Sequence, residues 1–321
     1  MKRTNESCRT VKFTGVICAV LILCFALFAA FPRRTAEAKT SPAIVIEQTT
    51  GRVLFERDAD KRAYPASTTK ILTALVVRET LPLGLTVEVP KEAAGTEGSS
   101  IYLRAGEKLT VEELLYGLML RSGNDAAVAL ALAAGGSVPR FAEMMNERAR
   151  GCGATHSHFV NPHGLHDDAH YTTARDLALI TREAYRDPDL RRIMSTKSVT
   201  VGEGESRRHF VNKNKLLTNY EGGNGVKTGY TTKSGRCLVG GAYRDGMQLI
   251  GVVLDRYDMW EAMRAMLDRA FAEYRMTDVL TLPRWEEGMR SVEASFGKDG
   301  APHPSAYPVK KEGEPLGVRW V

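Results

Sequence analysis

The pattern of apolar and polar positions first predicts paired strands near both ends of one region of the chain. Residues 43–48 and 52–57 each contain a short apolar run, and they flank Thr-Thr-Gly, which is typical of a β-hairpin. Residues 236–244 and 247–255 are again apolar and meet at a short Asp-Gly turn. We expect these segments to be strands of one antiparallel sheet.

Helical spacing of apolar residues dominates the chain between about residues 66 and 195. The clearest helical stretches are 110–120, 125–134, 137–150 and 173–185. A further amphipathic helix is predicted at 259–274. Strands at both ends of a region with helices between them predict an α+β fold, in which the helical region packs against the antiparallel sheet.

The two ends of the chain differ from this main region. After Tyr274, several Pro and Gly residues and short apolar segments predict a small β-rich tail. We therefore divide the chain into a leader at 1–38, a main domain at 39–275 and a short, truncated β-rich segment at 276–321.

The leader has the pattern of a secretory signal peptide. Basic residues precede a charge-free run from Phe13 to Phe31, and Ala-Glu-Ala at 36–38 offers small residues for a signal peptidase. The apolar run is long for a signal, so an uncleaved membrane anchor is the alternative. Either outcome predicts an extracytoplasmic protein of the cell envelope, secreted or associated with the membrane through this segment.

Charge gives no reason to expect a nucleic-acid partner. The leader holds six Lys or Arg against two Asp or Glu, so +4 of the net charge of +6 lies there and only +2 remains elsewhere. No nucleic-acid-binding signature accompanies it. Beyond the leader the cysteines are Cys152 and Cys237, which could form one disulfide or remain separate thiols; we expect separate thiols.

Three short motifs carry the candidate chemistry. Ser67 stands three residues before Lys70 at the head of an apolar-periodic run that begins with Pro65, so a helix would turn both side chains to one face. Lys70 could then activate Ser67 as a nucleophile. The alternative is a helix cap beside a solvated lysine. The same spacing recurs at Ser295 and Lys298 without helical context, which shows that the pattern alone is weak.

The second and third motifs follow in order along the chain. Ser122-Gly123-Asn124 joins two helical runs, although either polar residue could instead cap the second helix. Lys227-Thr228-Gly229 precedes the late strands. Lys233-Ser234-Gly235 competes with it, but residues 231–235 have the pattern of a turn.

In this order, S-x-x-K, S-x-N and K-T-G are the signature of serine penicillin-recognising enzymes. The chain resembles the D-alanyl-D-alanine carboxypeptidases, low-molecular-weight penicillin-binding proteins of serine peptidase family S11. The resemblance covers about residues 40–275 and includes the segments 64–75, 103–131, 159–180 and 225–235. It implies a β-lactamase/transpeptidase-like fold and no cofactor.

The resemblance also implies roles for these residues. Ser67, Lys70 and Ser122 would be catalytic, as nucleophile, base and proton relay. The substrate-binding residues would be Asn124, Lys227, Thr228, Gly229 and Tyr230, the last through its backbone N–H, which with that of Ser67 forms the oxyanion hole. Lys213 stands where some relatives have an arginine near the substrate carboxylate, although lysine lacks the bidentate fork.

Five histidines lie close together, at 156, 158, 163, 166 and 170. The spacing is of a kind that zinc sites use. The segment nevertheless matches a structural segment of the family that binds no metal. We therefore expect no metal here and assign the histidines to loop ordering and the surface.

The implied substrate is a peptidoglycan stem peptide ending in D-Ala-D-Ala, and β-lactam antibiotics would acylate Ser67 covalently. A DD-endopeptidase shares every motif and stays open. A class A β-lactamase would need a glutamate in an E-x-x-L-N context before K-T-G, which is not found between 155 and 200. A non-catalytic envelope protein that binds peptidoglycan or β-lactams is the remaining alternative.

Overall fold

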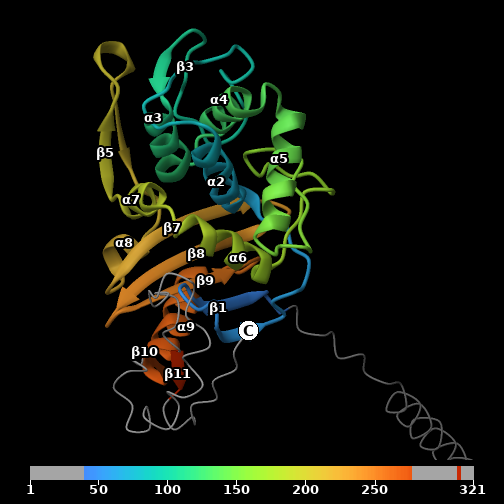
Figure 1. Cartoon of the computed structure of the whole chain (residues 1–321), viewed down its shortest axis with the longest axis vertical. Coiled ribbons are helices and arrows are strands. Elements are labelled where there is room, and N and C mark those ends of the chain that lie inside the picture. The colour runs from blue at the N-terminus through green and yellow to red at the C-terminus, as the bar shows by residue number, and fades with distance from the viewer. Residues whose placement is uncertain (1–39, 277–308, 312–321) are drawn as a thin grey trace, which may run out of the picture. The chain divides into compact units, whose positions relative to one another are not determined.

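The computed structural model describes residues 40–276 and 309–311 (Figure 1). Its centre is a five-stranded antiparallel sheet in the order β2-β1-β9-β8-β7. The strands are β1 (Ala43–Glu47), β2 (Val53–Arg57), β7 (Gly223–Thr231), β8 (Gly235–Arg244) and β9 (Met247–Val253). Early and late strands pair directly, with Ile44 opposite Val252. The predicted sheet is confirmed, and β7 is one of its two edges.

Helices fill the segment between the early and late strands. They are α2 (Lys70–Thr80), α3 (Val111–Tyr116), α4 (Asn124–Gly135), α5 (Val138–Gly151), α6 (Ala174–Ala184) and α7 (Pro188–Ser195), followed later by α8 (Leu216–Asn219) and α9 (Met259–Glu273). The predicted helices are confirmed. The run expected at 110–120 differs in its second half, because α3 continues as a π-helical turn, η2 (Gly117–Arg121). Such turns often occur at functional sites.

Short elements connect these helices. They are the 3₁₀ turns η1 (Ala66–Thr69) and η3 (Gly204–Ser206), and the strand pairs β3 (Thr86–Glu88) with β4 (Lys108–Thr110), β5 (Ser198–Val201) with β6 (Arg208–Val211) and β10 (Tyr274–Met276) with β11 (Val309–Lys311). Apart from β10 and β11, the predicted tail lies outside the described residues, as does the predicted leader. Within the described residues, no helix combines the length and apolarity that crossing a membrane requires.

The core lies in two layers, one on each face of the sheet (Figure 1). Successive side chains of β1 point to opposite faces. Ile44 and Ile46 join the helical layer with Leu72 of α2, whereas Val45 packs with Leu267 of α9 on the other face. Full burial of each such side chain stabilises the fold by about 1.5–3 kcal/mol. The sheet is therefore fixed from both sides, which gives β7 a rigid support.

A capping box fixes the start of the helical run that leads to Ser122. Thr110 accepts a hydrogen bond from the backbone N–H of Glu113, and the Glu113 carboxylate accepts one from the backbone N–H of Thr110. Two unpaired donors at the helix start are satisfied in this way. The capping box therefore fixes the start of the continuous α3–η2 run, which ends at Ser122.

The two cysteines of the described region are separate thiols, as expected. Cys237 is buried and Cys152 is half-buried. Burial raises the pKa of the Cys152 thiol to about 11 and that of Cys237 to about 12. Both thiols are therefore protonated and unreactive at neutral pH.

Candidate active site

Ser67 lies in a tight turn directly before α2. Residues Ala66–Thr69 form one 3₁₀ turn after Pro65, and Lys70 begins the α-helix. Ala66 has a positive φ of 48°, a left-handed conformation that non-glycine residues rarely adopt. The predicted helix start is therefore correct in place, but its first turn is 3₁₀ and not α-helical. This turn places Ser67 beside Lys70 at the start of α2 and close to strand β7.

The Lys70 side chain is completely buried and contacts three oxygen atoms. Its Nζ atom lies 3.0 Å from Ser67 Oγ, 2.7 Å from Asn124 Oδ1 and 2.6 Å from the carbonyl oxygen of His163. The alternative of a solvated lysine is therefore wrong. An ammonium group can donate to all three oxygens. A neutral amine can donate to two of them and accept the hydroxyl proton of Ser67.

The surroundings of Lys70 favour its neutral form. Burial lowers the pKa of Lys70 well below 10.5, and the positive charges of Lys227 and Lys213 lower it further, while Asp125 acts in the opposite direction. Desolvation and like charges both disfavour the ammonium ion. Lys70 therefore has the contacts and the electrostatics that a general base for Ser67 requires.

Ser122 and Asn124 lie where η2 gives way to α4. Ser122 ends η2 in a left-handed conformation with φ 66°, and it is 5% exposed. Asn124 is the first residue of α4, and its Nδ2 atom donates to the carbonyl oxygen of Glu97 at 2.6 Å. The N-cap of α4 is Gly123 and no side chain caps the helix. The capping interpretation of Ser122 and Asn124 is therefore wrong.

Asp125 is a buried carboxylate that sequence reasoning did not single out. Its carboxylate accepts hydrogen bonds from Ser100 Oγ at 2.6 Å, from Leu103 N at 3.0 Å and from Ile101 N at 3.1 Å. It therefore fastens residues 100–103 to the start of α4. A charged residue heading an otherwise apolar helix was the signal that could have revealed it.

Strand β7 brings the third motif to the nucleophile turn. Lys227 is 2% exposed, and its Nζ atom donates to the carbonyl oxygen of Thr228 at 3.0 Å. Burial, followed by the charge of Lys213, lowers the pKa of Lys227 to about 7. At Gly229 a β-carbon would lie 3.0 Å from the backbone nitrogen of Ser67, so the lack of a side chain lets β7 approach the nucleophile turn without crowding.

The competing Lys233-Ser234-Gly235 motif lies in the turn between β7 and β8. The Ser234 hydroxyl lies 2.9 Å from Thr231 Oγ1 and also bonds to nearby backbone atoms. Lys233 is exposed. The structure therefore brings Lys227 to Lys70 and keeps Lys233 in the turn.

Comparison with known proteins agrees with this arrangement. Residues 29–258 match the family described as D-alanyl-D-alanine carboxypeptidase, peptidase family S11. The chain belongs to this family. It is 36% identical over 253 residues to D-alanyl-D-alanine carboxypeptidase DacF of Bacillus subtilis, an alignment that covers 75% of this chain and 65% of DacF. It is 35% identical over 276 residues to a D-alanyl-D-alanine carboxypeptidase of Streptomyces sp. K15, covering 78% of this chain and 92% of that protein.

Solved structures of S11 relatives have the same fold. The Streptomyces K15 DD-transpeptidase superposes with a TM-score of 0.68 at 34% identity, over 72% of this chain and 96% of that one. A penicillin-binding protein homologue of Mycobacterium tuberculosis gives a TM-score of 0.70 at 32% identity, over 76% of this chain and 95% of its own. The predicted α+β, transpeptidase-like fold is thus confirmed.

Lys213 adds a third cation beside the two buried lysines of this S11 domain. Its backbone N–H donates to the carbonyl oxygen of Leu120 at 3.2 Å, which places it next to η2. Burial and the charge of Arg121 lower its pKa. Because its charge in turn lowers the pKa of Lys70 and of Lys227, Lys213 belongs to the same electrostatic cluster.

The histidine-rich segment supports the nucleophile turn. His170 is buried; its Nδ1 atom accepts from Val160 N at 3.1 Å, so its Nε2–H donates to Thr69 Oγ1 at 2.8 Å. Burial lowers the pKa of His170 to about 4, which keeps the ring neutral. His170 therefore orders this loop, although it is not a surface residue. No group of three metal-ligating side chains is found among the residues that the structure describes.

Gly164, in the same segment, touches the nucleophile turn. It has a φ of +85°, and a β-carbon there would lie 1.8 Å from the carbonyl oxygen of Ala66. The His163 carbonyl accepts a hydrogen bond from Lys70, and Gly164 contacts the backbone of Ala66 next to Ser67. The loop therefore supports both members of the Ser67–Lys70 pair. No sequence pattern predicted these two backbone contacts.

Proposed function

We propose that this protein is a serine D-Ala-D-Ala carboxypeptidase that removes the terminal D-alanine from peptidoglycan stem pentapeptides through an acyl-enzyme on Ser67. The observation that carries the proposal is the 3.0 Å contact between Ser67 Oγ and the Nζ atom of a fully buried Lys70, whose pKa is lowered by burial and by the charges of Lys227 and Lys213. Family membership supports the same activity.

Acylation begins with proton transfer from the Ser67 hydroxyl to neutral Lys70. Ser67 Oγ attacks the carbonyl carbon of the penultimate D-alanine, and the carbonyl oxygen becomes an oxyanion. The backbone N–H groups of Ser67 and Tyr230 donate to it, and each such donor lowers the barrier by about 3 kcal/mol. The close approach of β7 to the nucleophile turn at Gly229 supports this pairing.

Collapse of the tetrahedral intermediate breaks the C–N bond. The leaving amine takes up a proton that passes from Lys70 through the Ser122 hydroxyl, and D-alanine departs. Water then attacks the ester, Lys70 accepts a proton from that water, and Ser67 regains its own. Asn124 holds Lys70 in place throughout through the 2.7 Å contact of Oδ1 with Nζ.

The terminal carboxylate of the substrate is bound by polar and cationic side chains of β7 and of the segment beside η2. Lys227 and Thr228 would contact it from β7, and Lys213 would add a charge from beside η2. An anion that binds here stabilises the protonated form of Lys227, whose pKa of about 7 would otherwise leave it partly neutral. β-Lactams carry an equivalent carboxylate and would leave a long-lived ester on Ser67.

The envelope location is part of the same proposal. A substrate in the cell wall requires the domain to lie outside the cytoplasm, which agrees with a leader that directs export. Whether a water molecule or an amine accepts the acyl group decides between hydrolysis and transfer, and the peptide that is cleaved decides between carboxypeptidase and endopeptidase activity.

The deciding experiment is intact-protein mass spectrometry after incubation with benzylpenicillin, together with an assay for D-alanine released from a D-Ala-D-Ala pentapeptide. We expect one penicilloyl adduct and D-alanine release, both absent in Ser67→Ala. Consumption of penicillin without a lasting adduct would establish a β-lactamase instead. An unmodified protein with intact drug and no released D-alanine would favour a non-catalytic binding protein.

A further inference from the structure

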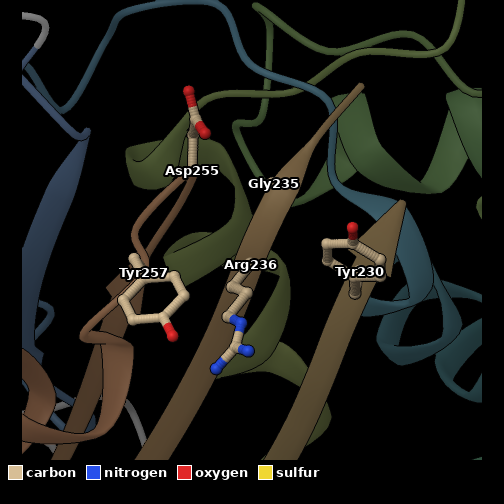
Figure 2. Close-up of a pocket in the computed structure, with 5 residues that line it drawn as sticks. All are labelled: Tyr230, Gly235, Arg236, Asp255 and Tyr257. Carbon is tan, nitrogen blue, oxygen red and sulfur yellow. The ribbon is translucent and has the colours of Figure 1, made fainter. Parts of the chain in front are cut away.

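A cavity of about 360 Å³ lies on the sheet beside the last residues of β7 (Figure 2). It is lined by Tyr230, Gly235, Arg236, Asp255 and Tyr257. Tyr230 and Arg236 are directly opposite each other in the pairing of β7 with β8, so their side chains share one face of the sheet. None of these side chains takes part in the proposed acyl transfer, in which Tyr230 acts only through its backbone.

The cavity is lined by one guanidinium group, one carboxylate and two aromatic rings. The Arg236 guanidinium lies 4.6 Å from the centre of the Tyr257 ring, an arrangement that holds the guanidinium plane in place. Tyr257 is 82% exposed and Tyr230 is 65% exposed, so two large apolar surfaces face solvent here. In Figure 2 Arg236 lies between the two rings. A guanidinium group that lies between two aromatic rings can bind a planar anion such as a carboxylate.

The charge of Arg236 is available to a ligand. Among the described residues, no carboxylate forms an ion pair with Arg236. Asp255 lines the cavity, but its carboxylate lies over Gly235 and points away from the guanidinium in Figure 2. The neighbouring Arg256 is neutralised by Asp258 through two contacts of 2.9 Å. Arg236 therefore supplies the positive charge of the cavity.

The position of the cavity relative to the acyl-transfer residues identifies the part of the substrate that reaches it. In the proposed function, Lys227 and Thr228 bind the terminal carboxylate, and the backbone of Tyr230 binds the scissile carbonyl further along β7. The peptide on the acyl side of the scissile bond therefore continues toward the end of β7. An extended peptide adds to the free edge of such a strand.

The distance between the free edge of β7 and Arg236 on β8 also limits which part of a peptide can reach the cavity. A peptide on the free edge of β7 lies two strand spacings from β8, which is about 10 Å. One of every two successive side chains projects onto the face that carries Tyr230 and Arg236. A long side chain or a branch can cross the Tyr230 ring and place an anionic end group at Arg236.

We propose that the cavity is an acyl-side subsite for a carboxylate carried on a long side chain or branch of the donor peptide. Arg236 binds the carboxylate through its two terminal nitrogens, Tyr257 supports the guanidinium, and Tyr230 packs against the apolar stem of the branch. The subsite rests on the proposed carboxypeptidase function, and it would make this enzyme prefer acidic stem peptides to neutral ones.

The test uses two matched donor peptides that end in lysyl-D-Ala-D-Ala. In one the lysine Nε carries a succinyl group, which ends in a carboxylate; in the other it carries the corresponding succinamide. A second pair has the modified lysine one residue earlier, because side chains alternate in direction. For each pair, kcat/KM for D-alanine release gives the ratio of carboxylate to carboxamide.

We expect the wild-type protein to prefer the carboxylate by about fivefold to tenfold in one of the two pairs. The preference should fall to about onefold in Arg236→Ala and be partly kept in Arg236→Lys, which keeps the charge without the fork. Lys233→Ala is the matched control, because it removes a nearby exposed cation that does not line the cavity. It should keep the full preference.

Equal kcat/KM values for carboxylate and carboxamide in both pairs, or a preference that survives in Arg236→Ala, would overturn the subsite alone. A preference lost equally in Lys233→Ala would show general electrostatic attraction and would also overturn it. A wild-type protein that releases no D-alanine from any of the peptides and forms no penicilloyl adduct would refute the proposed function together with the subsite.

Discussion

The Oδ1 atom of Asn124 lies 2.7 Å from Lys70 Nζ, and its Nδ2 atom is held at 2.6 Å by the carbonyl oxygen of Glu97. The Glu97 contact fixes the orientation of the amide, because only Nδ2 can donate to a carbonyl. Asn124 therefore offers Lys70 a neutral acceptor in a fixed place. A neutral acceptor orients the amine without adding a charge that would hold its proton.

Replacing this neutral acceptor with a charged one tests its importance. In Asn124→Asp a carboxylate would lie beside Nζ, raise the pKa of Lys70 and keep it protonated. We expect benzylpenicillin acylation at pH 7 to slow by about 100-fold or more, with the acylation limb of the pH profile displaced to higher pH.

Asn124→Ala is the control for this change. It removes the orienting contact but adds no charge, so its rate should fall without displacement of the pH profile. An Asn124→Asp variant whose profile keeps the wild-type position would contradict a base role for Lys70.

The pH dependence of acylation should reflect the two buried lysines. Lys70 must be neutral to accept the Ser67 proton, so the rate rises as pH passes its lowered pKa. Lys227 must be charged to attract the substrate carboxylate, so affinity falls as pH rises through about 7, its pKa in the free enzyme. A bell-shaped profile of the second-order rate constant for penicillin is the expected outcome.

Lys227→Arg separates the two limbs, since arginine stays charged throughout this range. The descending limb near pH 7 should disappear in this variant while the ascending limb remains. Stopped-flow acylation between pH 5 and pH 9 would measure both. If the descending limb persists in Lys227→Arg, another group causes it.

Gly164 offers a test of the support behind the nucleophile turn. An alanine β-carbon there would overlap the carbonyl oxygen of Ala66, at 1.8 Å. We expect Gly164→Ala to lower the free energy of unfolding by about 3 kcal/mol or more and to abolish penicillin acylation, because the turn that carries Ser67 must move.

Gly136→Ala provides the matched control. Gly136 has a similar positive φ of +71°, but no atom lies within 4 Å of its β-carbon position. Its substitution should therefore cost only the backbone strain, about 1 kcal/mol, and leave acylation unchanged. Thermal unfolding and acylation rates of the two variants, measured side by side, isolate the effect of the close contact.

A buried ion pair joins the loop near Asn124 to the β5–β6 hairpin. Arg208 donates to the Glu107 carboxylate at 2.6 Å and 2.8 Å, and to the carbonyl oxygens of Ile101 and Tyr102 at 2.9 Å and 3.1 Å. Glu107→Gln would leave the Arg208 charge without its partner. We expect a loss of about 2–4 kcal/mol of stability at pH 7.

The pH dependence of that loss has a defined sign. Hydrogen bonds from Arg208 lower the pKa of Glu107 from 4.5 to about 2 against the opposing effect of burial. Its ionised form therefore stabilises the fold fully above about pH 4.5, and this contribution disappears as pH falls toward 2. The stability difference between wild type and Glu107→Gln should shrink over that interval in urea unfolding experiments. A constant difference would contradict the assignment.

The sequence predicted the elements that periodicity and turn chemistry determine. The hairpin at 43–57, the helical stretches and the late strands at 236–244 and 247–255 follow from local patterns, and the order of three motifs predicted which side chains would meet. The contacts of Lys70 with the His163 carbonyl and of Gly164 with Ala66 involve backbone atoms more than 90 residues away. No side-chain pattern records such contacts, because any residue type has a carbonyl group.

The Arg236 cavity was equally invisible in the sequence. Only the register of β7 with β8 brings Tyr230 and Arg236 to one face, and Tyr257 reaches Arg236 from the connection between β9 and α9. The buried role of Asp125 was different, since a carboxylate at the head of an apolar helix is a local signal that could have been used.

The left-handed backbone at Ala66 and Ser122 has a consequence for engineering this protein. Each conformation costs the folded state on the order of 1–2 kcal/mol, and a search for heat-resistant variants would select glycine at both positions. At residue 66 that replacement would loosen the turn next to the nucleophile; at residue 122 it would delete the hydroxyl itself. Selection for thermostability alone would therefore remove catalytic function first from these two positions.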